Sequence, residues 1–178
     1  MKYTTTLFLS FLLAGCTVHS TANDSKTFFI NGIASASPAV GYGIKNLYEE
    51  HGSGAYYAYS SPAAGLTHIN SIVEKISKDP SRVKLIGMSY GARIVHKIAH
   101  ELDKKNINVQ YIAIVDGAKT KAFPSNVVKL DNFYCTGGCI GGPVTVSPST
   151  TYREFSYPGS HIPFANDARV HSRILSQL

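Results

Sequence analysis

The stretch "KLIGMSYGARI" (residues 84–94) places a serine between two glycines, directly after a run of apolar residues. The run "RVKLIGM" (82–88) predicts a buried strand, and "YGARIVHKIAHELDKK" (90–105) spaces its apolar residues at helical intervals. Ser89 therefore falls where a strand ends and a helix begins. Two interpretations follow: a polar tight turn, or a nucleophile held at the tip of that turn.

Strand and helix patterns alternate on both sides of this stretch. Strands are predicted at 27–33, 55–60, 82–88, 109–117, 126–135 and 151–157, and helices at 41–52, 66–79, 90–105 and 166–178. Strands joined by helices need crossover connections. The pattern therefore predicts an α/β fold, with a mostly parallel sheet of about five to six strands and helices on both faces.

The composition fits a single globular domain. The chain has 178 residues, of which 44% are hydrophobic and 16% are charged. The net charge of +6 comes from scattered lysines and arginines that form no run. A nucleic-acid-binding surface requires clustering of such residues, so no nucleic-acid partner is expected.

The first sixteen residues, "MKYTTTLFLSFLLAGC", have the pattern of an export signal. A lysine at position 2 precedes an apolar stretch that is shorter than the roughly 20 residues needed to span a bilayer. The ending Leu-Ala-Gly-Cys resembles the bacterial lipobox, in which the signal peptide is cut before a cysteine that then carries an acyl (palmitate) anchor. An ordinary signal peptide is the alternative.

The lipobox resemblance implies three segments. Residues 1–15 are the lipoprotein signal peptide, residues 16–25 hold the lipidated Cys16 and a flexible polar tether, and residues 26–178 form the folded domain. Thr17 permits sorting to the outer membrane. The expected location is the bacterial cell envelope, with the lipid anchor as the contact to the membrane.

Two further cysteines, Cys135 and Cys139, lie in the glycine-rich stretch "CTGGC". In an oxidising compartment such a pair predicts a small disulfide. Zinc is less favoured, because two thiols without neighbouring ligands make only half of a zinc site. No metal site is expected.

Polar residues gather at the predicted carboxyl ends of the strands, where parallel sheets bind ligands. Ser89 follows the third strand, Asp116 ends the fourth and His161 follows the last. Gly87-Met88-Ser89-Tyr90-Gly91 matches the nucleophile elbow G-x-S-x-G, in which glycines leave room for a strained strand-to-helix turn. The order serine, aspartate, histidine is that of α/β-hydrolases.

These residues resemble those of a compact α/β-hydrolase of the lipase/esterase kind, similar in size to the smallest bacterial lipases and to cutinases. The resemblance covers the whole domain after the tether. "FFINGIAS" stands where such enzymes carry a His-Gly oxyanion motif, and Asn31 replaces the histidine. The resemblance implies a serine nucleophile, a histidine base and an orienting acid, with oxyanion donors from the backbone N–H groups of Tyr90 and of Ile33 or Ala34. It implies no cofactor.

Two aspartates compete for the role of the acid in the predicted triad. Asp116 follows "YIAIV" at the end of a predicted buried strand, as in pancreatic-type lipases. Most α/β-hydrolases take the acid from one strand later, which here favours Asp131. Asp131, however, lies inside "NVVKLDNFYC", where the strand continues past it. Asp116 is therefore the preferred assignment.

Seven histidines compete for the role of the base. His161, on a predicted loop in "YPGSHIPF", is preferred because it follows the last strand. His96 and His100 are four residues apart, but Lys97 stands where H-E-x-x-H has glutamate, so they are interpreted as a solvated helix face. His171 is interpreted as a packed residue of the last helix.

The favoured function is a serine esterase that acts on small-molecule or lipid esters and is anchored to the envelope. One alternative is a thioesterase or other deacylase with the same triad, since one fold serves several chemistries. The other is a non-catalytic envelope lipoprotein on the same fold. A large lid is not expected, because the longest insertion is the loop at about 136–150.

Overall fold

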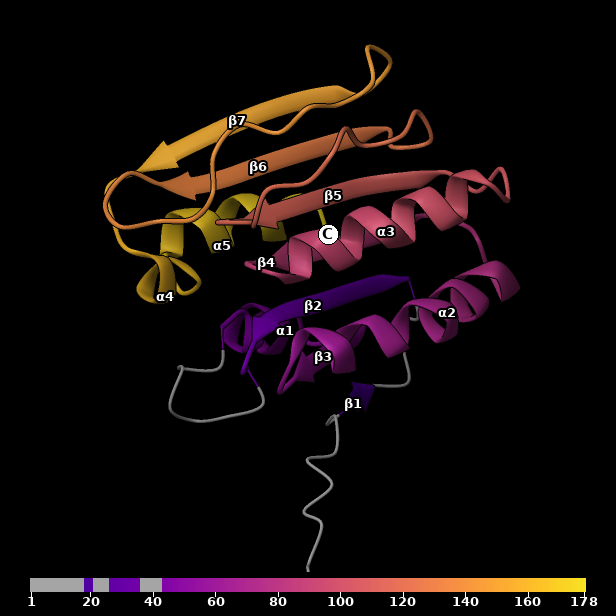
Figure 1. The fold of residues 1–178 in the computed structure, drawn as a ribbon, viewed down its shortest axis with the longest axis horizontal. Helices are drawn as coiled ribbons and strands as arrows, with labels where there is room; N and C mark the ends of the chain where they lie inside the picture. Colours follow the sequence, from indigo (N-terminus) through magenta and orange to yellow (C-terminus); the bar gives the residue numbers. More distant parts are fainter. Residues whose placement is uncertain (1–17, 21–25, 36–42) are drawn as a thin grey trace, which may run out of the picture.

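The computed structural model describes residues 18–20, 26–35 and 43–178. In this part of the chain, strands run side by side in one sheet in the order β1-β3-β2-β4-β5-β6-β7 (Figure 1). Their bounds are β1 (Val18–Ser20), β2 (Thr27–Ile33), β3 (Ala55–Tyr59), β4 (Val83–Met88), β5 (Val109–Val115), β6 (Lys129–Cys135) and β7 (Thr151–Tyr157).

Strands β2 to β7 are all parallel, and β1 pairs antiparallel with β3. The predicted α/β fold with a mostly parallel sheet is confirmed. The strand β1 is one more than predicted, because it lies in the segment 16–25 that was expected to be a tether. The predicted signal peptide 1–15, Cys16 and the rest of that segment lie outside the described residues.

Helices cover both faces of the sheet (Figure 1). They are α1 (Lys45–His51), α2 (Pro62–Lys78), α3 (Gly91–Asp103), α4 (His161–Phe164) and α5 (Ala168–Leu175). Helices α2 and α3 pack on one face, and α1 and α5 pack on the other. Two hydrophobic cores result, one on each side of the sheet.

The alternating direction of side chains along a strand lets one strand contribute residues to both cores. In β2, Phe28 and Ile30 belong to the core under α2 and α3, whereas Phe29 belongs to the core under α1 and α5. All three side chains are fully buried. Successive side chains of a strand point to opposite faces, so a strand covered on both sides must be apolar throughout.

Local side-chain chemistry sets several helix ends. Helix α2 begins four residues earlier than predicted, because the Ser61 hydroxyl accepts a hydrogen bond from Ala64 N at 3.3 Å and Pro62 suits the first helical turn. At α5, the Asp167 carboxylate accepts from Arg169 N at 2.9 Å, as expected of a cap.

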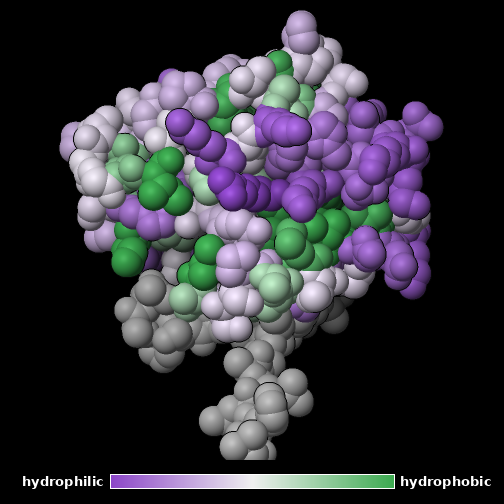
Figure 2. All heavy atoms as spheres, viewed as in Figure 1, coloured by the Kyte–Doolittle hydropathy of each residue, from purple (hydrophilic) through white to green (hydrophobic). Residues whose placement is uncertain are grey.

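The surface over α2 and α3 is mostly hydrophilic, with hydrophobic areas between the polar side chains (Figure 2). No helix in the described part of the chain combines the length and the apolar character needed to cross a membrane.

Candidate active site

Ser89 lies in the sharp turn between β4 and α3. Its φ of 53° falls in the left-handed region, which non-glycine residues adopt only where the surrounding structure holds them. Its N–H donates to Val115 O at 3.0 Å, and its carbonyl accepts from Ala92 N and Ala118 N at 3.2 and 2.9 Å. The turn is thus tied to both β5 and α3, and the Ser89 side chain is held at the carboxyl end of the sheet.

Two glycines make room for this turn. A Cβ at Gly91 would lie 2.1 Å from Ile30 O, because α3 starts directly against β2. A Cβ at Gly32 would lie 2.9 Å from Ser89 Cβ, because the end of β2 passes beside the serine. Both contacts are shorter than van der Waals distances allow, so the elbow needs glycine at each position.

His161 and Asp116 complete a hydrogen-bonded chain with Ser89. His161 Nε2 lies 3.0 Å from Ser89 Oγ, and His161 Nδ1 lies 2.5 Å from Asp116 Oδ2. The Asp116 side chain is fully buried, and that of His161 is 26% exposed. His161 is the first residue of the short helix α4. The prediction that it lies on a loop is therefore wrong.

The buried carboxylate of Asp116 is held by the backbone as well. Asp116 follows β5 directly with a φ of 40°, and it accepts from Gly141 N at 2.8 Å and Ile140 N at 3.3 Å. Burial alone would raise its pKa. The hydrogen bonds from His161, Gly141 and Ile140 outweigh burial, so the pKa of Asp116 lies below its ordinary value. The carboxylate is therefore charged at neutral pH.

Asp131, the other candidate acid, lies in a different network. It is buried on β6 and accepts from Arg153 Nε at 2.7 Å, from Arg153 Nη2 at 2.5 Å and from the Tyr111 hydroxyl at 3.0 Å. Burial and the adjacent Asp131 raise the pKa of Tyr111, so its phenol stays protonated and donates. Asp131 thus joins β6 to β5 and β7, and His161 bonds to Asp116.

The end of β2 lines the same cavity as Ser89 and His161. Asn31, at the position of the usual histidine, is buried, and its Oδ1 accepts from Gly32 N at 2.9 Å and Ile44 N at 3.4 Å. Its Nδ2 donates to Tyr56 Oη at 2.7 Å. The buried Asn31 side chain therefore holds the end of β2 in place. Because the N–H of Gly32 donates to Asn31 Oδ1, it is already hydrogen-bonded within the fold.

A cavity of about 110 Å³ opens beside Ser89 Oγ, between the β2 end and α4. Ile33 and Ile162 both line it, and both side chains are close to half exposed. Tyr90, whose N–H is the other predicted oxyanion donor, directly follows Ser89 and precedes α3. A small substrate group fits between these walls, within reach of the serine.

Cys135 and Cys139 are joined by a disulfide at the base of the loop that holds Asp116. The same loop contacts the segment before His161, since Cys139 Sγ lies 3.6 Å from Gly159 O. Within the described residues, Asp116 and these two sulfur atoms form a group of metal donors within 4.8 Å of one another. Because the sulfurs are bonded to each other and Asp116 is bonded to His161, this group is not available to a metal.

The remaining histidines lie away from this chain of hydrogen bonds. His171 is buried, as predicted, and its ring nitrogens face Glu50 and Ala165 O. The interpretation of His96 and His100 as a solvated face is wrong in one respect. Both rings are half-buried and lie against Ala122 O, in the segment after β5.

Sequence reasoning missed the donors to Asp116. Ile140 and Gly141 belong to the loop 136–150, in which the sequence predicts no site residue. The sequence offered only the two adjacent glycines of "CIGG". In the structure, a Cβ at Gly141 would lie 2.5 Å from Asp116 Oδ1. Only a glycine lets the backbone approach the carboxylate so closely.

No family model matches the chain, and no curated protein matches its sequence. Solved structures do match. The monoacylglycerol lipase of Paleococcus ferrophilus has a TM-score of 0.60 at 13% identity, over 92% of this chain and 98% of the lipase. The thioesterase domain that cyclises the lipopeptide antibiotic surfactin has a TM-score of 0.57 at 15% identity, over 91% and 92% of the two chains.

An α/β-hydrolase superfamily protein from Enterococcus faecalis is also similar, with a TM-score of 0.52 at 11% identity, over 91% of this chain and 93% of that protein. At such identities the likeness concerns the fold. The chain has an α/β-hydrolase fold.

Proposed function

We propose that this chain is a serine hydrolase that cleaves carboxylic esters through Ser89, His161 and Asp116. The observation that carries the proposal is the continuous hydrogen-bonded chain from Ser89 Oγ through both ring nitrogens of His161 to the buried Asp116. A serine hydroxyl is a weak nucleophile until an adjacent base takes its proton. An intact chain of this geometry argues against a non-catalytic lipoprotein with a vestigial serine.

Each residue has a step in the proposed reaction. Ser89 Oγ attacks the ester carbonyl while His161 Nε2 takes its proton, and the same nitrogen then protonates the leaving alcohol. Water hydrolyses the resulting acyl-enzyme by the same route in reverse. Asp116 holds the His161 proton on Nδ1 and stabilises the imidazolium. Its charge at neutral pH, which follows from its lowered pKa, suits this role.

The backbone N–H groups of Ile33 and Tyr90 are the proposed oxyanion donors. The hydrogen bond from Gly32 N to Asn31 supports this choice, because that N–H is already used within the fold. The small cavity and its isoleucine rim favour short acyl chains, or the end of a longer chain presented at a membrane. The matched lipase acts on monoacylglycerol, an ester of this kind.

A thioesterase is the second candidate, and the likeness to the surfactin thioesterase domain favours it. Attack, acyl-enzyme formation and deacylation proceed in the same way on a thioester. Turnover of p-nitrophenyl esters against acyl thioesters of the same chain length separates the two: a higher kcat/KM on the ester supports the esterase.

The location is part of the proposal. The lipobox-like end of the first sixteen residues supports lipidation of Cys16 and anchoring in the bacterial envelope, with Thr17 permitting the outer membrane. Mass spectrometry of the protein from the cell envelope tests this step. Acylated Cys16 at the mature N-terminus supports the anchor, and a mature protein with an unmodified Cys16 contradicts it.

The activity is tested with a panel of p-nitrophenyl esters of rising chain length. The wild type should turn over the shortest members best. Ser89→Ala should fold and have no measurable turnover, while Ser71→Ala, an exposed serine of α2, should match the wild type. Undiminished turnover by Ser89→Ala contradicts the proposal.

A further inference from the structure

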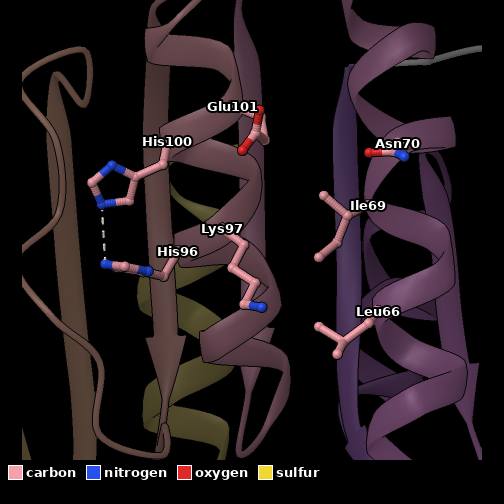
Figure 3. Close-up of a pocket in the computed structure, with 7 residues that line it drawn as sticks. All are labelled: Leu66, Ile69, Asn70, His96, Lys97, His100 and Glu101. Carbon is pink, nitrogen blue, oxygen red and sulfur yellow. Dashed lines mark hydrogen bonds between the residues drawn. The ribbon is translucent and has the colours of Figure 1, made fainter.

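Three ligand-type atoms converge on the side of α3 that faces away from α2. His96 Nε2 and His100 Nε2 are 3.2 Å apart, and Ala122 O lies 3.1 Å from the first and 3.2 Å from the second. Figure 3 shows both rings turned away from α2, with their facing nitrogens joined by the dashed line. The two imidazoles and the carbonyl therefore form a nearly equilateral triangle.

This triangle has the dimensions of one face of a metal coordination sphere. Tetrahedral Zn²⁺ with bonds of about 2.0–2.1 Å places its ligand atoms about 3.3–3.4 Å apart. An octahedral ion with similar bonds places neighbouring ligand atoms about 2.8–3.0 Å apart. The observed separations of 3.1–3.2 Å lie between these values, so small movements of the rings fit either geometry.

The surroundings hold the two rings in place. His96 packs edge-on against Phe123, with ring centroids 5.1 Å apart, and against His100, with centroids 4.5 Å apart. Phe123 is itself buried in the core, so the segment that carries Ala122 O is fixed relative to α3. The site is preorganised from one side, and because Ala122 is exposed, solvent can supply the remaining ligands.

Each Nε2 lies at hydrogen-bond distance from Ala122 O, which can only accept, so a metal ion would take the place of the proton on each donating nitrogen. A neutral imidazole binds a metal through Nε2 when its single proton sits on Nδ1. The nearby Lys121 repels a bound cation, which limits the affinity.

We propose that His96, His100 and the carbonyl oxygen of Ala122 form a binding site for a divalent transition-metal ion of the kind that prefers imidazole, such as Zn²⁺. The site is separate from the proposed catalytic residues, since His96 lies seven residues, about two helical turns, beyond Ser89. A bound ion would join α3, which begins next to Ser89, to the segment that follows Asp116. It would therefore stabilise the frame that holds both residues.

The test is calorimetric titration of the metal-stripped, untagged full-length chain with ZnCl₂ under non-reducing conditions. We expect one Zn²⁺ per chain, and a rise in Tm with Zn²⁺ because an ion that binds only the folded state stabilises it. His96→Gln and His100→Gln should each weaken Zn²⁺ binding at least about tenfold. Loss of a residue that only orients a metal ligand already weakens binding by about tenfold or more, and loss of the ligand itself should cost at least as much. His68→Gln, on α2, and His161→Gln should bind Zn²⁺ like the wild type.

Absence of stoichiometric binding by the wild type would overturn the proposal. So would binding that persists in the His96→Gln/His100→Gln double variant or disappears in His161→Gln. If the variants do not fold by circular dichroism, anomalous diffraction from Zn²⁺-soaked crystals of the wild type decides. A peak about 2.0–2.2 Å from both Nε2 atoms supports the site, and a peak elsewhere alone refutes it.

Discussion

Exchange of Asp116 for asparagine tests whether Asp116 is the catalytic acid, when it is compared with the same exchange at the buried Asp131. Gly141 N donates to Oδ1 and His161 Nδ1 faces Oδ2. In Asp116→Asn the shorter hydrogen bond from Gly141 N, at 2.8 Å, keeps the amide oxygen at the place of Oδ1. The amide nitrogen then takes the place of Oδ2, where the longer hydrogen bond from Ile140 N, at 3.3 Å, is lost, and it donates to His161 Nδ1. The proton of His161 is then forced onto Nε2, which can no longer accept the proton of Ser89.

The expected loss is about 10⁴-fold in kcat, the effect of the same exchange in serine proteases, with little change in KM. This loss corresponds to about 5.4 kcal/mol of barrier. The matched control is Asp131→Asn. Its amide cannot accept all the hydrogen bonds from Arg153 and Tyr111, so the free energy of unfolding should fall by about 1–3 kcal/mol while kcat stays unchanged.

Steady-state kinetics on a short p-nitrophenyl ester and urea unfolding measure the two effects on the same samples. The two variants should therefore show opposite patterns, one in kcat and the other in stability. Loss of kcat in Asp131→Asn together with an active Asp116→Asn would refute the assignment of the acid.

Three further predictions concern the frame around the site. Gly91→Ala should destabilise the fold by about 3 kcal/mol or more in urea unfolding, because its Cβ meets the backbone oxygen of Ile30, whereas Gly142→Ala, with open space around its Cβ, should match the wild type. Replacement of Cys135 and Cys139 by serine should lower kcat by up to about tenfold, because the loosened loop should donate one hydrogen bond fewer to Asp116. An unchanged kcat would show that the disulfide does not position the acid. Asp167→Ala should lower the free energy of unfolding by about 1 kcal/mol through loss of the α5 cap, and a change below about 0.3 kcal/mol would contradict that role.

The fold followed from hydrophobic patterns, because each buried element keeps one period over its whole length. The stripe of α3 and the continuous apolar run of β4 place Ser89 at their junction without reference to any distant residue. Asp116 and His161 were predicted for the same reason, since each follows a strand whose carboxyl end lies at the same edge of the sheet.

Segments without a repeating hydrophobic pattern were not predicted from the sequence. Helix α4 has four residues, one of them proline, which is too short for a helical pattern. The segment 136–150 has no regular element, so the approach of Gly141 N to Asp116 depends on a backbone path that only the fold defines. Strand β1 is three residues of pairing at the sheet edge, in a polar stretch typical of a linker.

The pairing of His96 and His100 with Ala122 escaped for a related reason. A helical wheel places both histidines opposite the apolar stripe of α3, and that position usually faces water. The segment after β5 folds back over this face, anchored by Phe123 in the core. The spacing of apolar residues in that segment does not predict that it packs against α3.

The central claim is that Ser89 is an activated nucleophile, and covalent labelling with a fluorophosphonate probe tests it most directly. Such probes react with a serine only when a base removes its proton, so the assay does not depend on the choice of substrate. Intact-mass and peptide mass spectrometry should find one probe per chain, attached to Ser89, with labelling slowed in His161→Gln. An unlabelled Ser89 in the folded wild type, or equal labelling of Ser89→Ala, would contradict the account.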